Sequence, residues 1–254
     1  MAAQTRRQAG TLALVKASSL ACGRGRTLAW SGPSPRPRQS PTNHLVAGTD
    51  PSSKPSLLYR VIARGSSPVV YGLFRLRTEG RENLPAEGFV LASNHLSNFD
   101  AWPLGLAVYP RQLRFMAKAE LYKPVLGAIL EGCGAFPVRR GERDPEAYRT
   151  AVRLAREGEV VAMFPEGTRR EKGARKKWIA RPHPGAARIA LAAGVPLVPA
   201  AVTGGDRLAR LGPLRVRVGP PIETADLVGI RRREAAERAT ERLMKRIAEL
   251  EGGS

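Results

Sequence analysis

The stretch that decides the fold is Phe89-Val90-Leu91-Ala92-Ser93-Asn94-His95-Leu96-Ser97-Asn98-Phe99-Asp100. Its first four residues are apolar, which predicts a short buried strand, and the polar residues after them predict a turn. We expect the strand to deliver His95 into that turn and Asp100 to the start of a helix. A strand, turn and helix in this order indicate an α/β sheet with functional side chains at the end of a strand.

His95 and Asp100 stand five positions apart, so that the carboxylate can orient the imidazole. A histidine held in this way can take a proton from an alcohol, because its unperturbed pKa lies near neutral pH. The carboxylate fixes the tautomer and stabilises the imidazolium. No serine or cysteine nucleophile is needed if the hydroxyl of the substrate attacks. The alternative is that His95 only bonds to its own turn and Asp100 caps a helix.

The chain contains three histidines, which narrows the search for such a base. His44 lies in a segment rich in proline and serine, and His183 stands between two prolines in a basic loop. His95 is therefore the histidine in a setting suited to catalysis.

The length of 254 residues and an apolar content of 43% suffice for a packed core, and a single domain is the simpler organisation. The formal net charge is +20, and the first acidic residue is Asp50. Seven basic residues precede Asp50, so the rest of the chain still carries about +13. Such a surface favours an anionic membrane, a phosphorylated substrate, coenzyme A or nucleic acid. A merely solvated basic surface is the alternative.

The two cysteines, Cys22 and Cys133, do not suggest a disulfide framework and favour a reducing compartment. No apolar run reaches the roughly 18 residues that a membrane-spanning helix needs. We therefore predict peripheral attachment at the cytoplasmic face of a membrane.

Residues 1–52 are rich in arginine, serine, proline and glycine and predict a disordered basic extension. This leaves residues 53–254 as the predicted globular domain. The extension also resembles an organelle transit peptide, and an upstream start codon wrongly chosen would explain it equally well.

Residues 55–74 predict two short amphipathic helices broken at residues 65–68, which suit either a membrane interface or a cover over the core. Beyond residue 83, short apolar or alternating runs predict strands at 89–92, 113–117, 135–138, 160–164, 197–202 and 214–218. Helices are predicted at 145–157, 186–193 and 231–250. The pattern favours an α/β fold with a mixed central sheet flanked by helices.

A second motif, Phe164-Pro165-Glu166-Gly167-Thr168-Arg169, follows the predicted strand 160–164. The two motifs resemble the N-H-x-S-x-x-D and F-P-E-G-T-R blocks of the glycerolipid acyltransferase family, specifically the bacterial-type 1-acyl-sn-glycerol-3-phosphate acyltransferases. A G-x-x-F-I-D-R block looks matched at residues 134–140, with Arg139 where the aspartate is usual. Residues 195–199 match a V-P-x-x-P block, and the order of the blocks agrees over residues 57–222.

The resemblance implies an enzyme that moves a fatty acyl group from acyl-CoA or acyl carrier protein to the free hydroxyl of lysophosphatidic acid, forming phosphatidic acid in phospholipid biosynthesis. His95 is then the general base and Asp100 orients it. A backbone amide or a side chain must stabilise the oxyanion. The resemblance implies no acyl-enzyme, cofactor or metal.

The resemblance assigns substrate binding to Lys118, Arg140, Glu166, Gly167, Thr168 and Arg169. In the 166–169 turn, Gly167 permits close backbone approach to a phosphate, while Thr168 and Arg169 offer a hydroxyl and a guanidinium. Glu166 orients this set or binds the glycerol backbone. The division of roles between Arg139 and Arg140 stays open.

The basic run 169–181 around Trp178 suits lipid headgroups or the phosphoadenosine of coenzyme A, and a solvated loop is the alternative. Other readings are acylation of glycerol 3-phosphate or another lysophospholipid, a thioesterase, and a non-catalytic basic protein that binds membranes or nucleic acid. The last leaves both motifs unexplained. The sequence contains no recognisable nucleic-acid module, so no nucleic-acid partner is expected.

Overall fold

The computed structural model describes residues 55–97, 99–139, 144–167, 182–205 and 211–253. Within these residues no helix is long and apolar enough to cross a membrane. The extension predicted for residues 1–52 lies outside the described residues. The domain boundary predicted after residue 52 therefore stays a prediction.

A seven-stranded sheet runs through the described residues in the order β1-β7-β6-β2-β5-β3-β4. Its strands are β1 Arg77–Glu79, β2 Phe89–Ser93, β3 Leu113–Lys118, β4 Ala135–Val138, β5 Val160–Met163, β6 Leu197–Thr203 and β7 Arg215–Val218. Neighbouring strands are parallel except β6 and β7, which are antiparallel. The predicted mixed sheet is confirmed.

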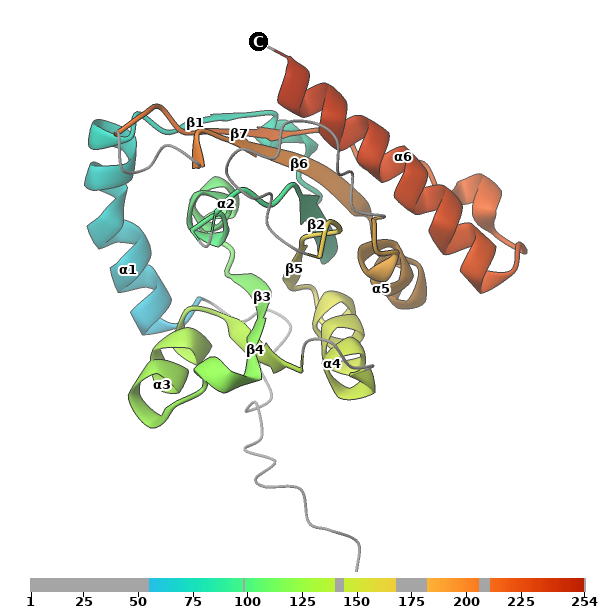
Figure 1. Cartoon of the computed structure of the whole chain (residues 1–254), viewed down its shortest axis with the longest axis horizontal. Helices are drawn as coiled ribbons and strands as arrows, with labels where there is room; N and C mark the ends of the chain where they lie inside the picture. The colour runs from blue at the N-terminus through green and yellow to red at the C-terminus, as the bar shows by residue number, and fades with distance from the viewer. Residues whose placement is uncertain (1–54, 98, 140–143, 168–181, 206–210, 254) are drawn as a thin grey trace, which may run out of the picture. The chain divides into compact units, whose positions relative to one another are not determined.

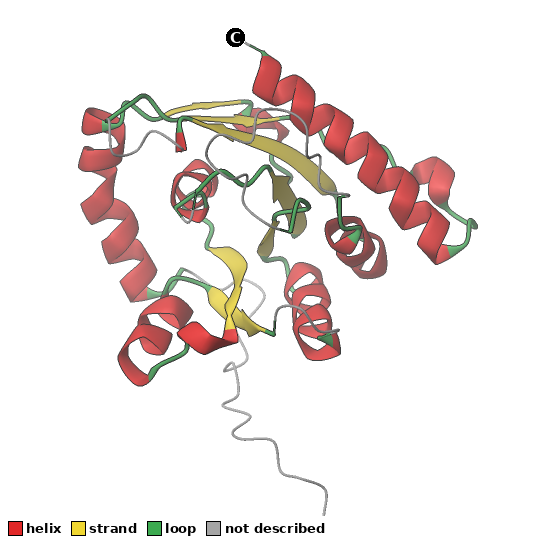
Figure 2. Ribbon diagram, in the orientation of Figure 1, coloured by secondary structure: helices red, strands yellow, loops and turns green. Residues whose placement is uncertain are grey.

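Helices cover both faces of this sheet, as Figure 2 shows with helices in red and strands in yellow. They are α1 Leu57–Pro68, α2 Ala101–Val108, α3 Pro124–Gly132, α4 Pro145–Arg156, α5 Gly185–Ala193 and α6 Arg232–Gly252. In Figure 1, α1 to α3 lie on one side of the strands and α4 to α6 on the other. The predicted arrangement of a sheet flanked by helices is confirmed.

Strand β2 lies inside the sheet, and all five of its residues are buried. Phe89 and Leu91 pack with α1 and α2, whereas Val90 and Ala92 face the core under α4, α5 and α6. A parallel strand covered on both faces needs an unbroken apolar sequence, because successive side chains point to opposite faces. This requirement explains why residues 89–92 are all apolar.

The predicted helix break at residues 65–68 is wrong. Helix α1 continues to Pro68 and leads directly into a single π-helical segment, η1 Val69–Leu73. Pro68 has no N–H to donate, and the Ser67 hydroxyl donates to the Ala63 carbonyl over 2.6 Å. The chain then widens into a π turn, in which Phe74 N donates to the Val69 carbonyl over 3.2 Å. The proline therefore reshapes the helix without ending it.

The chain order creates a switch point between β2 and β5. From β2 the chain crosses one face through α2 to β3, and from β5 it crosses the other face through α5 to β6. In open α/β sheets ligands bind at such a point, outside the carboxyl ends of the strands. Residues 94–100 and 164–167 follow those two ends.

Candidate active site

The His95 ring and the Asp100 carboxylate meet in the turn after β2. His95 Nδ1 lies 3.0 Å from Asp100 Oδ2. The same oxygen accepts the backbone N–H groups of Leu96 and Ser97 at 2.7 and 2.8 Å. Asp100 is 1% exposed and His95 is 8% exposed. Three donors therefore hold the carboxylate in place.

Asp100 directly precedes α2, yet its side chain makes no capping hydrogen bond to that helix. Its partners lie upstream, in its own turn. The alternative that Asp100 caps a helix is therefore wrong. In the neutral tautomer that donates to the carboxylate, Nδ1 carries the proton and the lone pair of Nε2 can accept one.

The second carboxylate oxygen of Asp100, Oδ1, is buried and has no hydrogen-bond partner among the described residues. Gly205, after β6, closes this side of the carboxylate. A Cβ atom added to Gly205 would lie 2.8 Å from Oδ1. A side chain at position 205 would thus push on Asp100.

Asn94 ties the same turn to β6. Its side-chain amide donates to the Val202 carbonyl and accepts the Val202 N–H, both over 2.8 Å. The Ser93 hydroxyl donates to Asn94 Oδ1 over 3.0 Å. Asn94 thus continues the pairing of β2 with β6 by one side chain and anchors the position of His95.

Phe164 stacks on the His95 ring, with centroids 4.2 Å apart and an angle of 20° between the planes. The sheet register explains the contact, because Ala92 pairs with Met163 and the two chains leave β2 and β5 side by side. The two sequence motifs therefore meet in space. The stacked ring limits rotation of the imidazole about its side-chain bonds.

The turn after Phe164 contains Glu166, which is buried, and Gly167, whose φ is +69°. His183, set aside on sequence grounds, lies against this turn: its N–H donates to the Pro165 carbonyl over 2.7 Å. A Cβ atom added to Gly167 would lie 2.5 Å from His183 Cδ2. His183 thus belongs to the candidate site, and no local spacing in the sequence points to it.

Lys118 ends β3 and is exposed, at the same sheet edge as His95 but with β5 between their strands. Arg139 follows β4, and its guanidinium Nε lies 3.8 Å from Asp144 Oδ2, while its N–H donates to the same oxygen over 2.9 Å. Arg139 is thus engaged with the residue that caps α4. Arg140, Thr168, Arg169 and the basic run 169–181 lie outside the described residues.

A buried histidine oriented by a carboxylate, at the switch point of a mixed α/β sheet, defines a site able to remove a proton from a hydroxyl group. The sequence profile of the Acyltransferase family matches residues 75–203, which include this site. The chain belongs to this family.

Individual relatives agree with this assignment. A 1-acyl-sn-glycerol-3-phosphate acyltransferase of Bacillus subtilis is 37% identical over 181 residues, which are 69% of this chain and 88% of the relative. A chloroplastic enzyme of that name from Brassica napus is 30% identical over 176 residues. That match covers 63% of this chain and 49% of the relative, so the chain spans about half of the plant protein.

A solved structure also resembles this fold. It is the 1-acyl-sn-glycerophosphate (LPA) acyltransferase PlsC from Thermotoga maritima, with a TM-score of 0.56 and 25% identity. The match covers 78% of this chain and 80% of the other.

Proposed function

We propose that this chain is a 1-acylglycerol-3-phosphate O-acyltransferase, which transfers a fatty acyl group to the free hydroxyl of lysophosphatidic acid and forms phosphatidic acid. The observation that carries the proposal is the buried His95–Asp100 pair stacked on Phe164. The names of the relatives support the choice of acceptor.

In the proposed reaction, His95 Nε2 takes the proton of the acceptor hydroxyl as the oxygen attacks the thioester carbonyl. Asp100 stabilises the imidazolium that forms. The tetrahedral intermediate collapses, the carbon–sulfur bond breaks, and the imidazolium returns the proton to the departing thiolate. The products are the ester and a free thiol, so no acyl-enzyme is involved.

Substrate binding is proposed for the six residues of the sequence analysis. For Glu166 and Gly167, the proposal is supported by their position in the turn that follows Phe164, whose ring stacks on His95. Lys118 is exposed at the same sheet edge, where a cation can reach a phosphate. Thr168, Arg169 and Arg140 are included on their motif positions alone.

We further propose acyl-CoA or acyl carrier protein as the donor and a place in phospholipid biosynthesis. The protein is placed at the cytoplasmic face of a membrane as a peripheral enzyme, with residues 53–254 as the catalytic domain. The name of the chloroplastic relative is compatible with an organelle address as the alternative.

An assay of the purified full chain tests this function. Oleoyl-CoA or oleoyl-acyl carrier protein is supplied with lysophosphatidic acid, and thiol release and lipid product are followed together. We expect phosphatidic acid and thiol in equal amounts from the wild type. His95→Ala removes the base and is expected to lower the rate at least about a hundredfold while the fold is preserved.

Each other outcome has a distinct meaning. Thiol release without lipid product would indicate a thioesterase. Product with glycerol 3-phosphate or another lysophospholipid, and none with lysophosphatidic acid, would reassign the acceptor. Undiminished acyl transfer by His95→Ala would show that His95 is not the general base.

A further inference from the structure

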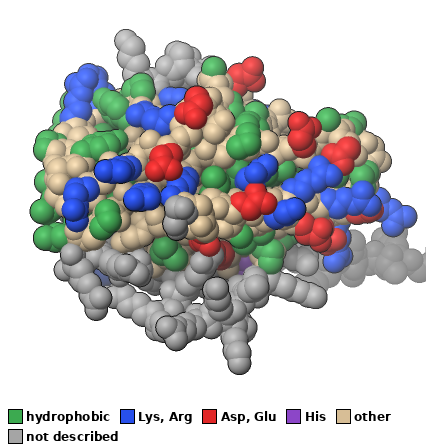
Figure 3. Space-filling model, turned by 90° about the horizontal axis from the view of Figure 1, so that it is seen from above, with side chains coloured by type: hydrophobic (Ala, Val, Ile, Leu, Met, Phe, Trp, Pro, Cys, Tyr) green, Lys and Arg blue, Asp and Glu red, His purple; other side chains and the backbone are tan. Residues whose placement is uncertain are grey.

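Exposed apolar side chains gather on two segments of the chain. Six lie on α1 and η1, and four on α3 and on the 3-10 turn before it, η3 Ala119–Leu121. We name these ten side chains the apolar platform: Leu57, Leu58, Val61, Val69, Tyr71, Leu73, Leu121, Val125, Leu126 and Ile129. Figure 3 shows hydrophobic side chains gathered at the end where Figure 1 places α1, while charges of both signs mix over α6.

Helix α3 is an unexpected member of this surface. Its sequence, from Pro124 to Gly132, is almost wholly apolar, yet Gly127 is its one buried residue. Val125 and Ile129 stand one turn apart, 76% and 45% exposed. A helix that turns such side chains outward buries little apolar area within its own domain, so it marks a contact surface.

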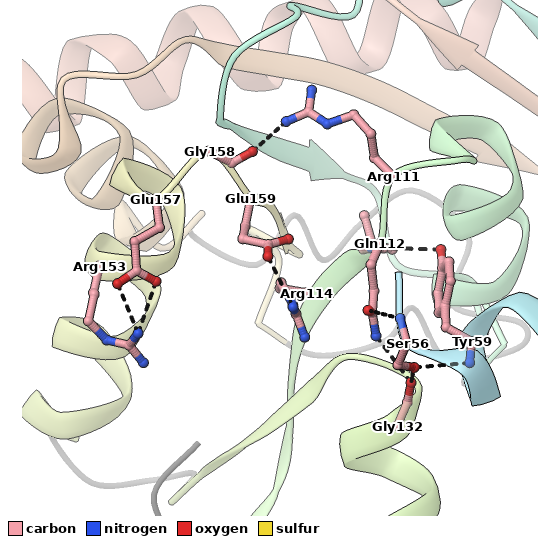
Figure 4. A network of polar contacts seen from close by, with 11 residues as sticks. Ser56, Tyr59, Arg111, Gln112, Arg114, Gly132, Arg153, Glu157, Gly158 and Glu159 are labelled. Atoms are coloured by element: carbon pink, nitrogen blue, oxygen red, sulfur yellow. Dashed lines mark hydrogen bonds and ion pairs between the residues drawn. The ribbon is translucent and has the colours of Figure 1, made fainter. Parts of the chain in front are cut away.

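The two helices are held as one unit. A Cβ atom added to Gly132 would lie 2.4 Å from Leu58 Cδ2, so α1 and α3 approach closely there. The Ser56 hydroxyl donates to the Gly132 carbonyl over 2.7 Å, and Ser56 N donates to Gln112 Oε1 over 3.0 Å. Gln112 Nε2 donates to the same Gly132 carbonyl over 3.1 Å (Figure 4). The platform is therefore fixed to the start of β3.

Charge indicates what covers the platform. Arg60 and Arg64 on α1, Arg75 two residues after η1, and Lys123 before α3 are exposed. None of them makes an ion pair in the described part of the chain. Apolar side chains next to unpaired cations suit an anionic bilayer. The apolar side chains enter its acyl region, and the cations bind its anionic headgroups. The second segment carries Glu120 and Glu131 against Lys123, whereas residues 57–75 carry three arginines and no acidic residue. Basic charge therefore prevails over the two segments together.

One end of the platform reaches the candidate active site. Trp102 Nε1, in the first turn of α2, donates to the Ser66 hydroxyl of α1 over 3.0 Å. Asp100 lies two residues before Trp102, and Phe99, the residue before Asp100, is 59% exposed. A narrow hollow beside these residues is lined by Phe99, Asp100, Trp102, Pro103, Gly205 and Leu214.

We propose that α1 and α3 form a single rigid lipid-binding platform, with α3 as its second lipid-inserted helix, and that it brings the His95 turn to an anionic bilayer. The acceptor lipid then reaches the site past Phe99 and Trp102 without crossing bulk water. This inference rests on the proposed function for the identity of the lipid, but the membrane contact is measurable without catalysis.

The test uses the full chain with Val125→Asp and Ile129→Asp combined, and the matched control Val228→Asp. Val228 is 84% exposed in the loop before α6, outside the platform. Flotation is measured with phosphatidylcholine vesicles with and without phosphatidylglycerol. Wild type and control are expected to bind the anionic vesicles, less so at high salt. The α3 variant is expected to bind at least about tenfold more weakly.

Activity then separates docking from chemistry. With a short-chain, dispersed lysophosphatidic acid, the α3 variant is expected to match the wild type, whereas with vesicle-embedded acceptor its rate falls together with its binding. Flotation equal to the wild type would overturn the role of α3. A wild-type dimer that the α3 variant separates would instead assign the platform to a second copy of the chain. A wild type inactive on every acceptor would refute the proposed function and leave the flotation result standing.

Discussion

At the scale of single residues, one carboxylate oxygen of Asp100 collects three hydrogen bonds while its other oxygen faces Gly205. The glycine has no side chain to disturb this arrangement. Only a fixed carboxylate can hold the imidazole in one tautomer and one orientation, and catalysis depends steeply on such positioning.

Gly205→Ala tests this requirement. The new methyl group would force Asp100 and hence His95 to shift, so we expect kcat to fall about tenfold with little change in the acceptor KM. Steady-state kinetics on dispersed acceptor provide the measurement. Gly65→Ala is the control, because a Cβ there meets no atom within 4 Å. Equal kcat values in the two variants would show that Asp100 tolerates the displacement.

The pairing of His95 with Asp100 was predictable because both residues lie in one turn, where sequence spacing approximates distance. Phe164, His183 and Gly205 reach the same site from β5, the 182–184 segment and the end of β6. Their approach depends on strand register and backbone conformation, which no local pattern encodes. The sequence therefore does not predict that His183 lies against the 165–167 turn.

At the scale of elements, the sequence predicts six strands within two residues of their observed ends. Strands β2, β5 and β6 are predictable as apolar runs that are almost wholly buried, and β7 is predictable as an alternation of arginines with buried valines. Strand β1 was missed: its Arg-Thr-Glu sequence has no apolar pattern, and it pairs with β7 across 138 residues. Helix α3 was missed because its sequence lacks the polar face that reveals a helical period.

Helix α1 is attached to α2 and to the start of β3 through Tyr59, and this attachment predicts a dependence of stability on pH. The Tyr59 hydroxyl donates to the Gly105 carbonyl over 3.2 Å, and burial raises its pKa to about 12. The folded state therefore keeps this proton between about pH 10 and 12, where the unfolded chain releases it. The free energy of unfolding should fall as pH rises through this window.

Tyr59→Phe is expected to flatten this fall and to lower stability near pH 7 by about 1 kcal/mol, since the Gly105 carbonyl loses its donor. Urea unfolding at a series of pH values measures both effects. Burial also raises the pKa of Tyr122, so a smaller slope remains in the variant. Identical slopes for the variant and the wild type would contradict the assignment to Tyr59.

At the scale of the whole molecule, the sheet, both cores and the described part of the site lie between residues 55 and 253. We therefore expect deletion of residues 1–52 to leave the unfolding midpoint and kcat on dispersed acceptor unchanged within about twofold. Thermal unfolding and steady-state kinetics of the truncated chain are the measurements. A chain that aggregates or fails to fold would show that the domain boundary lies further upstream.

The position of β2 in the sheet also governs when the protein can fold. Val90 pairs with Val161 on one side and with Leu197 on the other, and β1 has no partner until β7 is made. During synthesis on the ribosome, β2 therefore lacks its pairing partner β6 until residue 203 has emerged, and its apolar side chains stay incompletely covered. Such long-range pairing makes folding slow and exposes the nascent chain to aggregation and to chaperones. A chain terminated before β6 would lack the strand that anchors Asn94, so premature termination should yield no partly active fragment.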